Sequence, residues 1–418
     1  MRSMIDAFSE SSSGPLSGIR VLDLTRVLAG PWASQLLADY GADVIKVERP
    51  DSGDDTRAWG PPWLRNEADS DTSDSAYYVS SNRNKRSLCV DLSKPEGAEI
   101  VRDLAQRSDV LLENFKVGTM AKFGLAYDDL SAVSASLIYC SITAYGQSGS
   151  RAGQPGYDAM IQASGGLMSI TGEQDGPPQK VGVAIADIMA GMYATTAVLA
   201  ALVSRSSTGA GQHIDVPLYD SQVAWLANQN MNFLIGGKTP GRMGSGHPNL
   251  VPYQSFPTAD GHLMLAVGND RQFRACLECL GLEQLKKEDR FRSNAGRIAN
   301  RDELIEKLAA AFRRKTTAEW LLQLADHGVP SGPINTIAEV FSDDYADERQ
   351  LVRTLPHPAA GRVPTVANPV GFSATPVTYR LAPPVLGQHT MEILASDLGM
   401  SDARVRALAE AGVVKGAS

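Results

Sequence analysis

Asp187 is the only charged residue in the apolar stretch VGVAIADIMAGMYATTAVLAAL, which runs from residue 181 to residue 202. An ionised carboxylate is rarely left among apolar side chains unless another group pairs with it or a reaction uses it. The residues from Ile188 onward predict a buried helix that ends near Gly209. At the start of that helix Asp187 could cap free backbone N–H groups, or it could serve as an ionised nucleophile. The residues alone leave both roles open.

Other residues that could do chemistry give weaker signals. Cys276 and Cys279 form a C-x-x-C pattern, but no second cysteine pair and no nearby histidine completes a zinc set, so we expect core packing and no metal site. The segment Gly244–Gly246 forms a glycine loop with His247 near its tip. No G-x-G-x-x-G follows a strand, and the chain has no phosphate-binding lysine loop, no G-x-S-x-G and no H-E-x-x-H. These patterns therefore point to none of the commonest dinucleotide, nucleotide, hydrolase or zinc-protease sites.

The elements that must position these residues begin with a parallel sheet. A strand over GIRVLDL, a helix that opens near Pro31 and stops at Gly41, and a strand over DVIKVE form one strand–helix–strand unit. Such a unit implies parallel strands joined by a right-handed crossover. The pattern recurs at SLCVDL and VLLEN, and LIYCSIT adds a further strand. From Pro252 a short strand and amphipathic helices predict a smaller α+β domain.

The long polar loop from Arg49 to Ser75 carries Trp59 and Trp63. Loops of this length are uncommon in compact domains unless they serve a function, and tryptophan is rarely left exposed without a reason. We expect this loop to cover a site.

Composition places the chain among ordinary globular proteins. Its 418 residues favour two domains, and a net charge of −8 with no basic run argues against nucleic-acid binding. Four cysteines indicate a reduced, cytoplasmic protein. The polar N-terminal residues 1–14 predict a disordered tail without a targeting signal, and the apolar stretch around Asp187 predicts a buried helix, not a membrane span.

Motifs along most of the chain resemble those of the family III CoA-transferases, to which α-methylacyl-CoA racemase is related. They are LSGIRVLDLTRVLAGPWASQLLADYGADVIKVERPDSGDDTR, NRNKRSLCVDL, PEG, LLENF, GYDAMIQASGG, TGAGQHIDVPLYDS and LGQHT. The resemblance implies an α/β fold with a large Rossmann-like domain over residues 15–225 and 340–418. It also implies a small domain with linkers over residues 226–339. Two such chains would interlock as a homodimer, with each active site between one chain's large domain and the other's small domain.

The same resemblance implies a role for individual residues. Asp187 matches the family's catalytic aspartate, and CoA is a substrate and not a permanently bound cofactor. The CoA contacts are implied to be Val27, Leu28, Arg49, Asn114, Phe115, Lys122 and Tyr145. Residues near the reacting group are implied to be Trp59 and the loop of Gly244, Ser245, Gly246 and His247.

A carboxylate nucleophile suits CoA transfer between acids, through an aspartyl anhydride and an aspartyl-CoA thioester. Two other functions remain open. A racemase of this family places a histidine in the G-x-D motif, but this chain has GYD with Tyr157, and a tyrosine with a pKa near ~10 is a poor base at neutral pH. A non-catalytic CoA-binding protein would require Asp187 to be only a cap.

The segments GHPNLVPYQSF, GNDRQF and SGPIN resemble the succinate–hydroxymethylglutarate (glutarate) CoA-transferases more than they resemble formyl-CoA transferase, another member of the family. The resemblance implies succinyl-CoA as donor and a short dicarboxylic acid as acceptor. The distal carboxylate of such an acid needs a cation, and Arg83, Arg86 and Arg242 are candidates.

Overall fold

The structure, a computed structural model, describes residues 14–417 and divides into two compact units. The first comprises the described part of Met1–Leu167, Val181–Met231 and the described part of Asp347–Ser418. The second comprises Met168–Lys180 and Asn232–Ala346. All but the last residue of the predicted tail over residues 1–14 lies outside the described residues.

The predicted boundaries assign residues 168–180 to the large domain, whereas the structure groups them with the second unit. Backbone pairing explains the difference. The Gly244 N–H donates to the Gly172 carbonyl at 2.9 Å, and Arg242 Nε donates to the Glu173 carbonyl at 3.3 Å.

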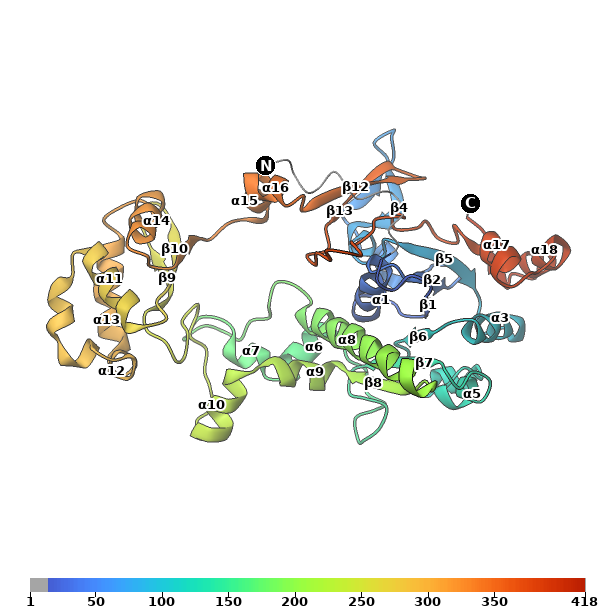
Figure 1. Cartoon of the computed structure of the whole chain (residues 1–418), viewed down its shortest axis with the longest axis horizontal. Helices are drawn as coiled ribbons and strands as arrows, with labels where there is room; N and C mark the ends of the chain where they lie inside the picture. The colour runs from blue at the N-terminus through green and yellow to red at the C-terminus, as the bar shows by residue number, and fades with distance from the viewer. Residues whose placement is uncertain (1–13, 418) are drawn as a thin grey trace. The chain divides into compact units, whose positions relative to one another are not determined.

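A seven-stranded sheet is the framework of the first unit (Figure 1). In order across the sheet its strands are β14 (Val414–Lys415), β5 (Lys85–Val90), β2 (Asp43–Glu48), β1 (Arg20–Asp23), β6 (Val110–Glu113), β7 (Ile138–Thr143) and β8 (His213–Pro217). Neighbouring strands run parallel, except that β14 pairs antiparallel with β5. The strands read as nearly continuous apolar runs because both faces of a parallel sheet are buried.

The strand order creates a topological switch point between β1 and β6. From β1 the chain moves outward to β2 and β5, and then it crosses to β6 and continues the other way to β7 and β8. In open α/β sheets, ligands bind outside the carboxyl ends of the strands at such a point. A site is therefore expected just after Asp23 and Glu113, where β1 and β6 end.

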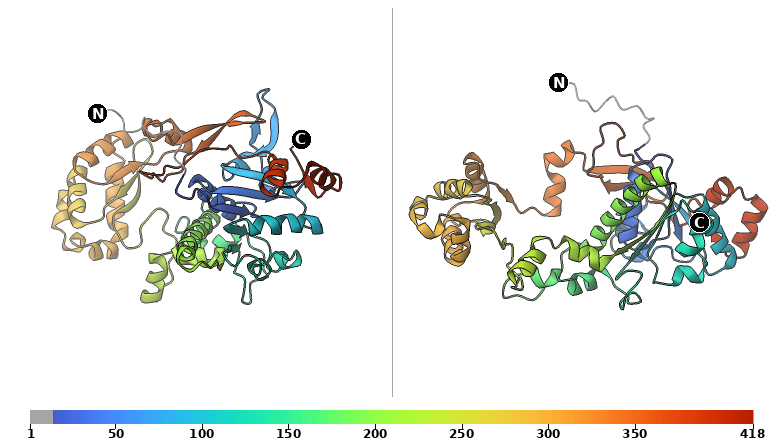
Figure 2. Two further views of the ribbon diagram at one scale, coloured as in Figure 1. Left: turned by 45° about the vertical axis from the view of Figure 1, so that its right-hand side comes forward. Right: turned by 60° about the horizontal axis from the view of Figure 1, so that its bottom comes forward.

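Helices cover both faces of this sheet. α1 (Ala29–Asp39) and α8 (Ile185–Thr208) pack on one face, and α3 (Pro95–Gln106), α5 (Tyr127–Ser131) and α18 (Asp402–Glu410) pack on the other. Figure 2 shows α17 (Thr390–Glu392) and α18 beside α3, although these helices lie far apart in the sequence. The C-terminal segment therefore completes the core of the first unit.

α8 is long and apolar enough to cross a membrane by length and composition alone, and 44% of its most apolar window is buried within the protein. It packs closely against α1, because a Cβ added at Gly191 would lie 2.6 Å from the carbonyl oxygen of Ala29. Such close packing is a property of a core helix. It also holds together the start of α1, which follows Leu28, and the N-terminal half of α8, whose first turn contains Asp187.

Shorter elements surround the sheet. They are a 3-10 helix over Asp55–Ala58, β3 (Trp63–Arg65), β4 (Asp71–Ser75), α2 (Ala76–Val79), α4 (Thr119–Lys122), α6 (Asp158–Ser164), α9 (Leu218–Trp225), β12 (Val352–His357) and β13 (Gly361–Val366). The helices α7 (Leu167–Ile170), α10 (Asn228–Gly236) and α16 (Asp344–Glu348) span the boundaries between the units.

The second unit is a small α+β body with its own core. An antiparallel sheet of β11 (Ser331–Pro333), β10 (His262–Ala266) and β9 (Tyr253–Pro257) packs with helices α11 (Asp270–Leu280), α12 (Asn294–Ala299), α13 (Arg301–Phe312) and α14 (Thr317–Asp326). α15 (Ile337–Ser342) follows them in the same unit and has no buried residue. Phe256, Phe312 and Trp320 form its centre, where the Trp320 indole N–H donates to the Phe312 carbonyl. Cys276 is buried in this core and Cys279 packs at its edge, and both thiols are free.

Candidate active site

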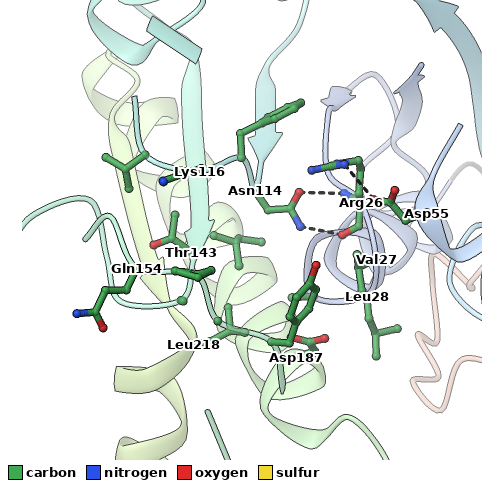
Figure 3. A pocket seen from close by; sticks show the side chains of 18 of the residues that line it. Arg26, Val27, Leu28, Asp55, Asn114, Lys116, Thr143, Gln154, Asp187 and Leu218 are labelled. Atoms are coloured by element: carbon green, nitrogen blue, oxygen red, sulfur yellow. Dashed lines mark hydrogen bonds and ion pairs between the residues drawn. The ribbon is translucent and has the colours of Figure 1, made fainter. Parts of the chain in front are cut away.

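A cavity of about 400 Å³ opens in the first unit at the switch point (Figure 3). Asp55 and Leu218 line it, together with four segments and one helix. The segments and the helix are the turn after β1 (Arg26–Ala29), the turn after β6 (Asn114–Val117), the end of β7 with its following residue (Ile142–Ala144), the loop before α6 (Ala152, Gln154–Tyr157) and α8 at Asp187. The cavity thus unites Asp187 with four predicted CoA contacts, which are Val27, Leu28, Asn114 and Phe115.

The turns after β1 and β6 are locked to each other by the Asn114 side chain. Its Oδ1 accepts the Arg26 backbone N–H at 2.9 Å, and its Nδ2 donates to the Arg26 carbonyl at 2.7 Å (Figure 3). The Arg26 guanidinium pairs with Asp55 at 2.9 Å and lies over the Phe115 ring. Both walls of the cavity therefore keep a fixed spacing.

Val27 adopts a left-handed backbone conformation with φ at 71°. A β-branched residue is rarely found there, because its side chain clashes with the backbone, and the strain is of order 1–3 kcal/mol. The conformation is held by Asp54, whose Oδ1 accepts the Val27 N–H at 3.2 Å. Asp54 is itself fixed by Lys46, at 2.8 Å, with both side chains fully buried.

Lys46 also donates to the Thr25 carbonyl at 2.9 Å. The buried Lys46–Asp54 pair therefore hydrogen-bonds the turn after β1 at two points, the Thr25 carbonyl and the Val27 N–H. Burial raises the pKa of Asp54, but the charge and hydrogen bonds of Lys46 and Thr56 outweigh it and bring the pKa to about 2. This carboxylate is therefore ionised at every physiological pH, and the turn keeps its shape.

Asp187 is 8% exposed and occupies the first turn of α8. The alternative that it caps this helix is wrong. Asp158 supplies the cap, because its Oδ1 accepts the backbone N–H groups of Ala186 at 2.8 Å and Asp187 at 3.4 Å. Within residues 14–417, the Asp187 carboxylate itself accepts no hydrogen bond.

Burial and the negative charge of Asp158 together raise the pKa of Asp187 to about 7, with burial the larger cause. A carboxylate with a raised pKa is more basic and hence a stronger nucleophile than an ordinary aspartate. At neutral pH a large fraction remains ionised. Among the described residues no hydrogen bond stabilises this carboxylate, and a carboxylate in that state is suited to act as a nucleophile.

Trp59 and Tyr77 lie beside this cavity without lining it. Their rings meet edge to face at 5.3 Å, and Trp59 is 43% exposed. Burial and the charges of Asp187 and Asp158 raise the pKa of Tyr77 to about 12, so its hydroxyl stays protonated near these carboxylates. Sequence reasoning identified Trp59 but missed Tyr77 and the capping role of Asp158. The GYD motif was the available signal for Asp158.

The other predicted CoA contacts lie at different distances from this cavity. Arg49 lines a neighbouring cavity of about 170 Å³, together with Val90, Phe115 and Phe123. Lys122 is exposed at the end of α4 and Tyr145 packs against Tyr219, and neither lines the cavities described here.

The loop from Gly244 to His247 belongs to the second unit and is held in place. Ser245 Oγ hydrogen-bonds Ser255 Oγ at 2.7 Å, and the His247 N–H donates to the Tyr253 carbonyl. Arg301 donates to the His247 carbonyl at 2.8 Å. Gly244 has φ at 56°, which favours glycine, and an added Cβ there would meet the Glu173 carboxylate.

Among the described residues, no group of three or more His, Cys, Asp and Glu side chains could hold a metal ion. The charged side chains that line the cavity are the carboxylates Asp55 and Asp187 and the cations Arg26 and Lys116.

Comparisons with known proteins agree on one family. A sequence profile of CoA-transferase family III matches residues 16–390. The chain is 48% identical to the succinate–glutarate CoA-transferase of Agrobacterium fabrum, over 91% of this chain and 95% of that protein. It is 43% identical to the succinyl-CoA:glutarate CoA-transferase of Mus musculus, over 97% of this chain and 91% of that protein. A solved CAIB/BAIF family protein from Brucella suis has a TM-score of 0.81 at 45% identity and covers 92% of this chain and 99% of that one.

The pKa of Asp187 generates a prediction for the pH dependence of the reaction. Only the ionised carboxylate attacks, so kcat should rise as pH increases through about 7. Asp158→Asn removes the neighbouring charge and keeps an amide oxygen that can accept the Ala186 N–H. The pKa of Asp187 should therefore fall, and the acidic limb of the kcat profile should move to lower pH. Asp220→Asn, an exposed site on α9, is the matched control. An unchanged profile in Asp158→Asn would contradict this electrostatic coupling.

Proposed function

Because this chain belongs to CoA-transferase family III, we propose that it moves CoA from succinyl-CoA to a short dicarboxylic acid, glutarate foremost. The proposal rests on the position of Asp187, whose carboxyl group lines the switch-point cavity and does not cap α8. The names of the Agrobacterium and mouse relatives support succinyl-CoA and glutarate as the pair of substrates.

The reaction follows from the nucleophile. The Asp187 carboxylate attacks the thioester carbonyl of succinyl-CoA, a C–O bond forms, the C–S bond breaks, and the CoA thiolate leaves. The thiolate then attacks the aspartyl carbonyl of the resulting anhydride, which releases succinate and leaves an aspartyl-CoA thioester. The acceptor carboxylate attacks that thioester, and the thiolate finally takes the new acyl group and restores Asp187. Each step exchanges groups of similar energy, so no ATP is needed.

CoA is a polyanion, and cations near the strand ends suit its phosphates. Arg49 and Lys122 were predicted from the resemblance, and Lys116 lines the cavity that contains Asp187. No carboxylate among the described residues pairs with Lys116 or Lys122, and Arg49 pairs with Asp55 at 3.0 Å near the surface. We propose that these three cations bind the phosphates, with CoA as a substrate and not a resident cofactor.

A racemase function receives less support from the geometry. Tyr157 lines the cavity and is 65% exposed, and no histidine lines it. A non-catalytic CoA-binding protein is also disfavoured. That reading required Asp187 to cap α8, and Asp158 does so instead.

Two of the three candidate cations for the distal carboxylate are already used in the fold. Arg83 pairs with Asp39 and is almost fully buried, and Arg86 pairs with Asp43 and Asp397. Arg242 alone of the three has no carboxylate partner among residues 14–417. We therefore propose Arg242 for the distal carboxylate.

We further propose a homodimer of interlocked chains in the cytoplasm. Exposed apolar side chains close together on one helix support an interface, because large apolar patches often mark contact surfaces. Exposed examples are Met192, Tyr193 and Val203 on α8, and Ile337, Val340 and Phe341 on α15. Four free cysteines are consistent with a reducing compartment.

Replacing the nucleophile tests the proposal directly. Asp187→Asn should lower transfer of CoA to glutarate by about a thousandfold or more, because an amide cannot attack a thioester. The fold should persist. The folded pKa of Asp187 lies above its unfolded value, so its ionisation disfavours the folded state as pH rises towards 7. Asparagine removes that penalty, and thermal unfolding above pH 7 should occur at the same or a higher temperature.

Incubation of the unmodified protein with succinyl-CoA should leave an activated ester on the same residue. Hydroxylamine should convert it to a hydroxamate, and borohydride should reduce it, each giving a mass change in the peptide that contains Asp187. Exchange of labelled succinate without α-proton exchange separates a transferase from a racemase. Normal transfer by Asp187→Asn with no adduct on this peptide would refute the mechanism.

Arg242→Gln tests recognition of the distal carboxylate. The preference for glutarate over valerate, expressed as a ratio of kcat/KM, should fall by about tenfold to a hundredfold, because one charge-assisted contact is lost. Arg292→Gln is the matched control in the same unit, since Arg292 is exposed and pairs with Asp289. An unchanged preference in Arg242→Gln would assign the distal carboxylate to another cation.

Sedimentation velocity over a dilution series tests the interlocked dimer. Chains that pass through one another separate only by unfolding, so the dimer should persist at the lowest measurable concentration. Folded monomer that appears on dilution would exclude interlocking.

A further inference from the structure

Glu113 is a buried carboxyl group that the proposed reaction does not use. It is the last residue of β6 and is 4% exposed. Its Oε2 accepts the backbone N–H of Phe115 at 2.8 Å. A hydrogen bond from residue i+2 back to residue i closes a tight turn, and this turn leads directly into the wall of the active-site cavity.

The turn over residues 113–117 is a shared wall of three cavities. Phe115 lines the cavity of about 400 Å³ that contains Asp187, the cavity of about 170 Å³ that contains Arg49, and a third cavity of about 170 Å³. Asn114, between Glu113 and Phe115, is the residue that locks this turn to Arg26. A shift of this turn would therefore move both Phe115 and the clamp on the opposite wall.

The third cavity surrounds the Glu113 side chain with polar groups. Ser141 and Tyr139 face it from β7, His213 and Asp215 from β8, Tyr127 and Asp128 from α5, and Lys116 from the turn itself. Ser141 hydrogen-bonds Glu113 and lies 2.9 Å from His213 Nε2, while the His213 ring stacks on Tyr127. No cation within this set forms an ion pair with Glu113 among the described residues.

No ion pair with a described residue stabilises the ionised form of Glu113, so its pKa is set by burial, a nearby charge and hydrogen bonds. Burial and, to a smaller extent, the charge of Asp215 raise the pKa of Glu113, whose net value is about 7. The hydrogen bonds from Ser141 and the Phe115 N–H oppose this rise, because they favour the ionised form. An ionised carboxylate accepts an N–H more strongly than a protonated one, so the turn is held most firmly when Glu113 is charged.

We propose that Glu113 is a positioning residue, which through its hydrogen bond to Phe115 holds the turn over residues 113–117 in the shape that CoA binding requires. This inference rests on the proposed function, since it takes CoA to bind at the switch-point cavity. The affinity of the protein for CoA then depends on the protonation of Glu113. Ionised Glu113 strengthens CoA binding, and bound CoA favours the ionised form of Glu113. Binding of CoA should then release protons near neutral pH.

The test separates Glu113 from Asp187 by removing the second group. In the Asp187→Asn background, calorimetry measures the Kd of CoA with Glu113 and with Glu113→Gln, between about pH 6 and about pH 8.5. The ratio of the two Kd values cancels the titration of the CoA phosphates. We expect CoA to bind more tightly to the Glu113 protein than to Glu113→Gln by about threefold to tenfold at the higher pH, with a smaller advantage at the lower pH. The midpoint should lie near 7.

Two further variants make the result specific. Ser141→Ala keeps the carboxylate but removes a hydrogen bond that lowers its pKa, so the midpoint should move to higher pH. This variant also serves if Glu113→Gln fails to fold. Glu99→Gln, at an exposed position of α3, should leave both the Kd and its pH dependence unchanged.

The outcomes distinguish this inference from the proposed function. If CoA binds but the Kd ratio does not vary with pH and Ser141→Ala does not move the midpoint, Glu113 is only structural and the inference is wrong. If the folded Asp187→Asn protein binds no CoA at any pH, the proposed function fails, and this inference fails with it.

Discussion

The buried ion pair between Lys46 and Asp54 is the interaction on which the geometry of the site depends. It joins β2, the loop before the 3-10 helix and the turn after β1, because Lys46 donates to Thr25 and Asp54 accepts from Val27. Removing two charges from water is expensive, and such pairs often contribute little net stability. The Lys46–Asp54 pair instead fixes the turn in a single conformation, with Val27 in a strained left-handed state. The cavity wall is therefore rigid before any ligand arrives.

A second constraint concerns where carboxylates are satisfied and where they are not. Asp54 is surrounded by donors and its pKa falls to about 2. The Asp187 carboxylate receives no hydrogen bond from residues 14–417, and burial and the charge of Asp158 raise its pKa to about 7. Asp158 makes this contrast achievable, because it takes over the capping of α8 that Asp187 would otherwise provide. The N-terminus of α8 is therefore capped although the Asp187 side chain makes no capping hydrogen bond. Structural and chemical duties are thus divided between two aspartates.

The sequence predicts the sheet and draws attention to the buried carboxyl group of Asp187 because both have local signals. Strand–helix–strand units show as apolar runs separated by Pro31 and Gly41, and Asp187 shows as one charge in an apolar helix. Pairings between distant segments have no such signal. Asp158 could not be identified as the cap, because its partners lie on another helix, and Arg83 could not be recognised as paired with Asp39. Candidate cations chosen from the sequence therefore include side chains that already form ion pairs within the fold.

The antiparallel strand β14 has a consequence for how the chain is made. It lies at the C-terminal end of the described chain, and it covers the edge of β5, near the N-terminal end. Until synthesis is complete, β5 presents unpaired N–H and C=O groups, and the sheet face that will contact Ile393, Leu394 and Val405 stays uncovered. Residues 232–346 emerge earlier and contain their own core, so they can fold while the first unit waits. A nascent chain that stalls after the second unit thus exposes an adhesive strand edge, and truncation of the last few dozen residues exposes it permanently.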